Sequence, residues 1–319
     1  MKLAGALAAA LSLVGRHGTL VAAASIFVGL AVPGLAAVCK PYLGEAIVVM
    51  LTLAFLRVDP NELFRHFTRP GLIAAATVWA MLVVPVILGL VFIAFRVNQS
   101  MPGLYFMLVL QMSAPGLMSS PALAALLGLD VALTLATLIV STAITPLTAS
   151  LFTHAFLGTA LASPLGFGLR LFLIIAGCAG AGAVIRFVTG RPFIEAQRER
   201  IDGLSVLAMF MFAVAAMDGV ADQFRANPLL VIELTALAFA LALGMIALTA
   251  LVFLRVGRAR AFAVGLIVGN RNIGLMLAAT SFAVPDIAWL YFAVAQFPIY
   301  LLPHLLKPLA KRLQQSAKA

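Results

Sequence analysis

Charged residues are scarce in this sequence: Asp, Glu, Lys and Arg make up 10% of its 319 residues, against about 25% in soluble domains. Cysteine and histidine are scarcer still, with two and four copies. Cys39 and Cys178 lie far apart inside apolar runs, and the histidines stand singly. This pattern excludes a disulfide framework and the ligand spacing of a metal site. We therefore expect no metal and no cofactor.

Catalytic constellations are also missing. The sequence shows no paired aspartates on neighbouring apolar runs and no serine with a nearby histidine, so we do not expect an enzyme. No basic stripe interleaved with aromatic residues is present, and we expect no nucleic-acid partner.

Apolar residues are what the sequence has in excess. They make up 64% of the chain, and the mean hydropathy is +1.13. A water-soluble fold has no surface on which to place so much Leu, Ala, Val and Ile. The net charge of +10 comes from basic residues between apolar runs, as at the cytoplasmic face of a membrane. The sequence thus predicts an all-α polytopic membrane protein whose first partner is the lipid bilayer.

Apolar runs of about 20 residues, each long enough to cross a bilayer, recur along the chain. We expect ten spans, at 19–39, 41–58, 70–95, 103–128, 130–152, 165–187, 203–223, 229–254, 261–283 and 287–306. With this count, sixteen of the 21 Lys and Arg residues lie on the same side of the membrane as the N-terminus. Only Lys40, Arg96 and Arg225 lie on the opposite side. The excess places both termini in the cytoplasm. High Ala, Leu and Arg usage is typical of a bacterial inner membrane.

Two of the ten spans contain residues that interrupt helices. The fourth has Pro115-Gly116 and Pro121 at its middle, and the ninth has Gly269 and Gly274 around three polar residues. Five spans followed by five, each set with its fourth span broken, is the layout of an inverted repeat. We expect one repeat at 1–152, a second at 153–306, and a basic cytoplasmic tail at 307–319. Broken helices at matching positions indicate a transporter binding site at the bilayer midplane.

These breaks also carry a family resemblance. SAPGLMSSPALAALLGLDVALTLATLIVSTAITPL at 113–147, VGNRNIGLMLAATSF at 268–282 and LRVDPNELFRHFTRPGLI at 56–73 resemble segments of the bile acid:sodium symporter family. The resemblance implies a ten-span fold with a panel domain and a core domain. It also implies that the two broken helices cross at the substrate site.

The resemblance fails at the residues that bind sodium in the family. Ser120, Asn272, Gly269 and Gly274 match, and Thr134 stands where another hydroxyl is expected. Five positions differ, where the family has Asn, Thr, Glu and two Gln: Pro121, Leu138, Ile267, Arg271 and Ala80. Sodium needs several oxygen ligands, and aliphatic side chains offer none. We therefore expect sodium-independent transport, with Arg271 as a cation surrogate that donates to carbonyls which would otherwise coordinate the ion.

The candidate substrate-binding residues are Ser119, Ser120, Asn270, Arg271 and Asn272. An arginine inside an apolar span is costly unless paired, and so Arg271 could bind an anionic substrate or serve only as a structural cation. The two asparagines could bind substrate or only cap the half-helices.

Carboxylates near the ends of spans have other expected roles. Asp130 is expected to cap the fifth helix. Glu45 and Asp218 are candidates for proton coupling if they are buried, and otherwise for a place at the membrane interface.

Together these features predict a secondary transporter of a small organic anion, which works by alternating access as the core domain rocks against the panel. One alternative is a permease like the auxin efflux carriers, which have the same fold. The other is a membrane sensor or channel that no longer alternates. No feature of the sequence indicates an oligomeric state.

Overall fold

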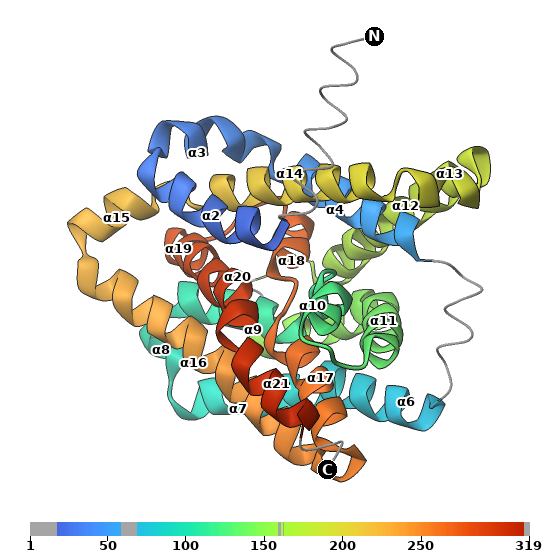
Figure 1. Cartoon of the computed structure of the whole chain (residues 1–319). Coiled ribbons are helices and arrows are strands. Elements are labelled where there is room, and N and C mark those ends of the chain that lie inside the picture. The colour runs from blue at the N-terminus through green and yellow to red at the C-terminus, as the bar shows by residue number, and fades with distance from the viewer. Residues whose placement is uncertain (1–17, 59–68, 159–160, 162, 316–319) are drawn as a thin grey trace. The chain divides into compact units, whose positions relative to one another are not determined.

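The computed structural model describes residues 18–58, 69–158, 161 and 163–315, and nearly all of this part of the chain is helical (Figure 1). Most of the segment 56–73 used for the family resemblance, and the last four residues of the basic tail, lie outside the described residues. The chain divides into two compact units, residues 1–58 with 176–233 and residues 59–175 with 234–319. Each unit therefore draws on both halves of the sequence.

The helices that lie wholly within the first unit come from both of its stretches of chain. They are α2 (Gly18–Ala31), α3 (Pro33–Cys39), the 3-10 turn η1 (Lys40–Tyr42), α4 (Leu43–Arg57), α13 (Arg191–Ala196), α14 (Arg198–Ala216) and α15 (Val220–Ala226). The division falls within α12 (Pro164–Thr189) and α16 (Pro228–Val252).

The second unit contains the two interrupted segments. Its first stretch holds α6 (Pro70–Val78), the π-helical turn η2 (Trp79–Val83), α7 (Val84–Ala94), α8 (Val97–Ser100), α9 (Pro102–Ser113), α10 (Ser120–Leu126) and α11 (Val131–Leu157). Its second stretch holds the 3-10 turn η4 (Leu254–Val256), α17 (Arg258–Gly269), α18 (Ile273–Ala279), α19 (Asp286–Val294), α20 (Gln296–Leu305) and α21 (Lys307–Gln315).

Within the described residues, six helical segments are long and apolar enough to cross a membrane: Pro33–Arg57, Pro70–Ala94, Val131–Leu157, Pro164–Thr189, Arg198–Ala226 and Pro228–Val252. The last five correspond to the third, fifth, sixth, seventh and eighth expected spans, whereas Pro33–Arg57 covers the second expected span and the end of the first. Pro102–Ser113 and Asp286–Leu302 are apolar but shorter. The all-helical membrane fold is thus confirmed, while the ten-span inverted repeat stays a prediction.

The first expected span differs from the structure. We expected one helix over 19–39, but α2 ends at Ala31 and α3 begins at Pro33. Val32 between them has φ −126° and ψ 74°. A proline ring disfavours helical backbone in the residue before it, and the run of apolar residues hid this local effect.

In the first unit, α14 packs against α2 and α4 (Figure 1). The α2–α14 contact is close at Gly29, where an added Cβ would lie 2.8 Å from the carbonyl oxygen of Val214. Arg57, at the end of α4, forms an ion pair of 2.7 Å with Asp202 of α14. The close backbone approach thus lies between α2 and α14, and the ion pair links α4 to α14.

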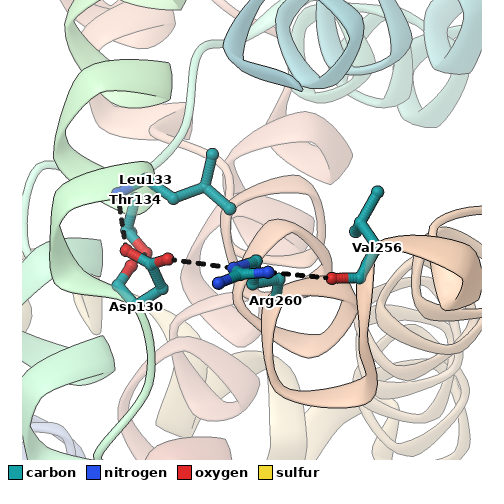
Figure 2. A network of polar contacts seen from close by, with 5 residues as sticks. All are labelled: Asp130, Leu133, Thr134, Val256 and Arg260. Carbon is teal, nitrogen blue, oxygen red and sulfur yellow. Dashed lines mark hydrogen bonds and ion pairs between the residues drawn. The ribbon is translucent and has the colours of Figure 1, made fainter. Parts of the chain in front are cut away.

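In the second unit, α9 packs against α11 and α19, and α17 packs against α11. Asp130 caps α11 as expected, because its Oδ1 accepts a hydrogen bond of 3.0 Å from the N–H of Leu133. Its Oδ2 lies 3.5 Å from Nε of Arg260 in the first turn of α17, and Figure 2 shows this link between the two helices.

Candidate functional site

The first break separates α9 from α10. Pro115 and Gly116 lie in the non-helical segment between Ser113 and Ser120. Proline has no N–H to continue the helix, and the preceding residue, Ala114, is extended with ψ 150°. Pro121 lies instead in the first turn of α10, where a missing N–H costs nothing.

The second break separates α17 from α18 and is shorter. It consists of Asn270, Arg271 and Asn272, between the last residue of α17, Gly269, and the start of α18. Gly274 lies in the first turn of α18. An added Cβ on Gly269 would lie 2.4 Å from Cγ1 of Ile246, so α17 can approach α16 closely only with glycine here.

The two breaks pair with each other through their backbones. Gly116 and Arg271 form an antiparallel β-bridge. The N–H of Leu117 donates to the carbonyl of Asn270 at 2.8 Å, and the N–H of Asn272 donates to the carbonyl of Pro115 at 2.9 Å. Backbone groups that the broken helices cannot satisfy internally are thus satisfied across the crossing.

The side chain of Arg271 is buried at this crossing, with 4% of its surface exposed. Its three nitrogen atoms donate to backbone carbonyls of three different elements. Nε donates to Val268 of α17 at 2.8 Å, Nη1 to Ala114 at the end of α9 at 2.7 Å, and Nη2 to Ala80 of η2 at 2.9 Å. The guanidinium therefore holds three segments of the second unit together.

The carbonyl of Ala80 is available because the helix is irregular there. The N–H of Val84 bonds to the carbonyl of Trp79, five residues back, and not to that of Ala80. The next residue is Pro85, which has no N–H to donate. A π-helical turn followed by proline leaves one carbonyl without its helical partner, and Arg271 bonds to it.

Helix ends, and not carboxylates, surround the charge of Arg271. No Asp or Glu among the described residues forms an ion pair with it. Two of its three carbonyls lie at the C-terminal ends of α9 and α17. Each such end carries about half a negative charge from the helix dipole. Both ends stabilise the positive charge but do not neutralise it.

The other expected substrate-binding residues lie in the same two breaks. Ser120 and Asn270 are buried, at 0% and 1% exposure. Ser120 Oγ and Asn270 Oδ1 have no hydrogen-bond partner in the described part of the chain. Asn272 caps α18 by accepting from the N–H of Leu275 at 3.1 Å, whereas the side chain of Ser119 makes no capping bond to α10.

The two carboxylates considered for proton coupling lie elsewhere, in the first unit. Glu45 is exposed in the first turn of α4. Asp218 follows α14 and forms an ion pair of 2.8 Å with Lys40, and its side chain is 23% exposed. Neither carboxylate is fully buried, which fits an interface location, and proton coupling stays a prediction.

Sequence reasoning missed a polar pair beside the crossing. The hydroxyl of Tyr291 in α19 donates to Oε1 of Gln111 in α9 at 2.6 Å. Gln111 could have been noticed, because it is a lone amide in an apolar span two residues before the helix ends. Tyr291 offers no such signal, because its neighbours in the sequence are apolar.

Residues 45–227 match the sequence profile of the sodium bile acid symporter family, and this match covers more than half of the chain. The chain belongs to the sodium bile acid symporter family. As a member it is a multi-pass membrane protein and a transporter of the bile acid symporter type, and the family consists of transporters and not enzymes. The match includes the first break but ends before Arg271. A search of the curated proteins found no match.

Proposed function

We propose that this symporter-family protein is a secondary transporter that moves a small organic anion by alternating access and does not use sodium. The observation that carries the proposal is the coordination of Arg271 by three backbone carbonyls. Carbonyl oxygens from separate elements are ligands that a bound sodium ion would use. The guanidinium of Arg271 bonds to these oxygens and provides the positive charge that a sodium ion would otherwise provide.

A second group of residues supports the loss of sodium binding. Ile267 and Leu138 stand where the family has a glutamate and a threonine, and both are buried, at 1% and 2% exposure. They also lie against the first break, because a Cβ on Gly116 would be 2.5 Å from Ile267 Cγ2 and 3.4 Å from Leu138 Cδ1. Aliphatic side chains at the crossing offer no ligand to a hard cation.

The substrate is assigned to the remaining polar groups of the crossing. Arg271 uses its three nitrogen atoms on the backbone and is nearly fully buried, which favours a structural role for its charge. Ser120 Oγ and Asn270 Oδ1 have no partner, and buried polar atoms ordinarily have one. We infer that a polar group of the substrate bonds to them, with Ser119 and Asn272 beside it.

The expected topology completes the proposal. Ten spans in two inverted repeats, with both termini in the cytoplasm of a cell with an inner membrane, agree with the distribution of basic residues. Two compact units are what an alternating-access mechanism requires, since one must move relative to the other.

Thermal unfolding tests the sodium part without a known substrate. Purified wild-type protein is titrated with sodium against choline at constant chloride and constant ionic strength. We expect no sodium-dependent rise in the unfolding midpoint, because a ligand stabilises the native state only where it binds. A midpoint that rises with sodium concentration relative to choline would overturn the proposal.

Uptake into proteoliposomes tests the transport part. Labelled organic carboxylates and sulfonates are offered with sodium or choline outside, and we expect equal uptake of the accepted anion in both. Ser120→Ala should raise the KM for that anion, because the substrate loses a hydrogen bond. Uptake that requires sodium, or an unchanged KM in Ser120→Ala, would contradict the assignment.

A further inference from the structure

A small pocket lies beside the crossing, within the second unit. Helices α7, α9, α16 and α17 form its walls, chiefly through Leu, Met and Phe side chains. Its volume is about 10 Å³, close to what one water molecule needs. Such a pocket has room for one water-sized solute.

Only two side chains in the lining are polar, Gln111 and Arg271. The amide oxygen of Gln111 accepts the hydrogen bond from Tyr291. Its amide nitrogen, Nε2, donates to no group among the residues that the structure describes. Because Tyr291 occupies the amide oxygen, the two amide N–H groups of Gln111 are the donors that remain without an acceptor in the described part of the chain.

Arg271 also has donors to spare. A guanidinium carries five N–H groups, and carbonyls accept from three of its nitrogen atoms. A fourth N–H faces only the sulfur of Met81, a weak acceptor at 4.0 Å. Both polar side chains of the pocket are therefore donors, and Arg271 carries a full positive charge.

We propose that this pocket binds one monatomic anion, with chloride as the ion tested. Amide N–H groups without an acceptor and a guanidinium disfavour sodium and favour an acceptor that carries negative charge. The room for one water-sized solute favours a monatomic anion over a carboxylate. Met112 and Met245 in the walls are flexible, and they can adjust to an ion slightly larger than water. This site is distinct from the proposed substrate site and does not depend on it.

The test is a chloride titration of the purified full-length protein. Sodium chloride replaces sodium gluconate at constant sodium and ionic strength, and thermal unfolding is followed. We expect a rise in the midpoint that begins near the dissociation constant and then amounts to about 3 °C for each tenfold increase in chloride. Bromide should act similarly. No chloride dependence would overturn the proposal, since the pocket would then hold only water.

Gln111→Glu separates a specific site from a general salt effect. Glutamate still accepts the Tyr291 bond but places a carboxylate where the amide N–H groups were, next to Arg271. We expect the chloride-dependent shift to vanish. Gln223→Glu, the same change on the exposed surface of α15, should keep the full shift. A shift that persists in Gln111→Glu would contradict the site.

A direct measurement covers the case in which Gln111→Glu does not fold. The line width of the chloride-35 NMR signal increases when the ion exchanges with a protein site. We expect broadening by the wild type that excess bromide reverses. No broadening beyond that of empty detergent micelles would overturn the proposal. Because sodium stays constant throughout, failure here leaves the sodium-independence proposal intact.

Discussion

The two helix breaks contribute different chemistry to the crossing they form together. The first, between α9 and α10, contains Pro115 and Gly116 and offers acceptors, including the carbonyl of Ala114. The second, between α17 and α18, supplies the donor, the guanidinium of Arg271. The first break exists because of local backbone restrictions, whereas the second places a charge inside the protein and depends on partners from other segments.

Replacing the donor should have the largest effect. In Arg271→Gln at least two of the three carbonyls lose their partner, and each lost bond to a charged group costs about 1.5–3 kcal/mol. We expect the free energy of unfolding to fall by about 3 kcal/mol or more, measured by thermal or denaturant unfolding in detergent. Arg225→Gln is the matched control, since that side chain is 72% exposed and should change stability by less than about 1 kcal/mol. Equal effects would show that the buried bonds carry no special weight.

Adding a side chain at Gly116 in the first break should have an intermediate effect on stability. In Gly116→Ala the new methyl group meets Ile267 Cγ2 at 2.5 Å, and overpacking of this kind costs about 1–3 kcal/mol. The double variant with Ile267→Ala should recover part of this loss because the clash is gone. Gly244→Ala in α16 meets nothing within 4 Å and should stabilise the protein by about 0.5–1 kcal/mol. Destabilisation by Gly244→Ala of the same size would rule out the steric explanation.

The capping residues should give the smallest effect and distinguish the half-helices that follow each break. Asn272→Ala removes the bond to the N–H of Leu275 and should cost about 1 kcal/mol. Ser119→Ala removes no capping bond and should leave stability nearly unchanged. Unfolding is measured without substrate, so that substrate binding does not affect either value. A larger loss in Ser119→Ala would reverse this comparison.

Local rules predicted the parts of the fold that depend on local chemistry. Asp130 is of a residue type that is favoured at N-caps, and it precedes an apolar run. The capping bond that this pattern predicts is present. The positions of five of the six long helical segments follow from apolar length alone, whereas Pro33–Arg57 begins inside the expected first span. The break at Val32 follows from an equally local rule about the residue before proline, which the apolar run of the expected first span concealed.

The sequence predicted which kind of group accepts from Arg271, but not which residues carry that group. The hypothesis that Arg271 replaces the sodium ion of the resembled family predicts that backbone carbonyls accept from this side chain. It cannot identify Ala80, which is 191 residues away and is available only because of a π-helical turn before Pro85. The bond between Gln111 and Tyr291 is hidden for the same reason, since 180 residues separate the two.

The tethered cation at the crossing has a consequence for energetics. A sodium ion can be taken from one solution and released into the other, and each transfer delivers free energy from its gradient. The guanidinium of Arg271 is covalently part of the chain, so it cannot be taken up from one solution and released into the other. The crossing is therefore assembled whether or not substrate is bound. Under the proposed sodium-independent mechanism, the carrier would return across the membrane with or without substrate, and it would accumulate substrate only when another gradient, including that of a counter-substrate, does the work.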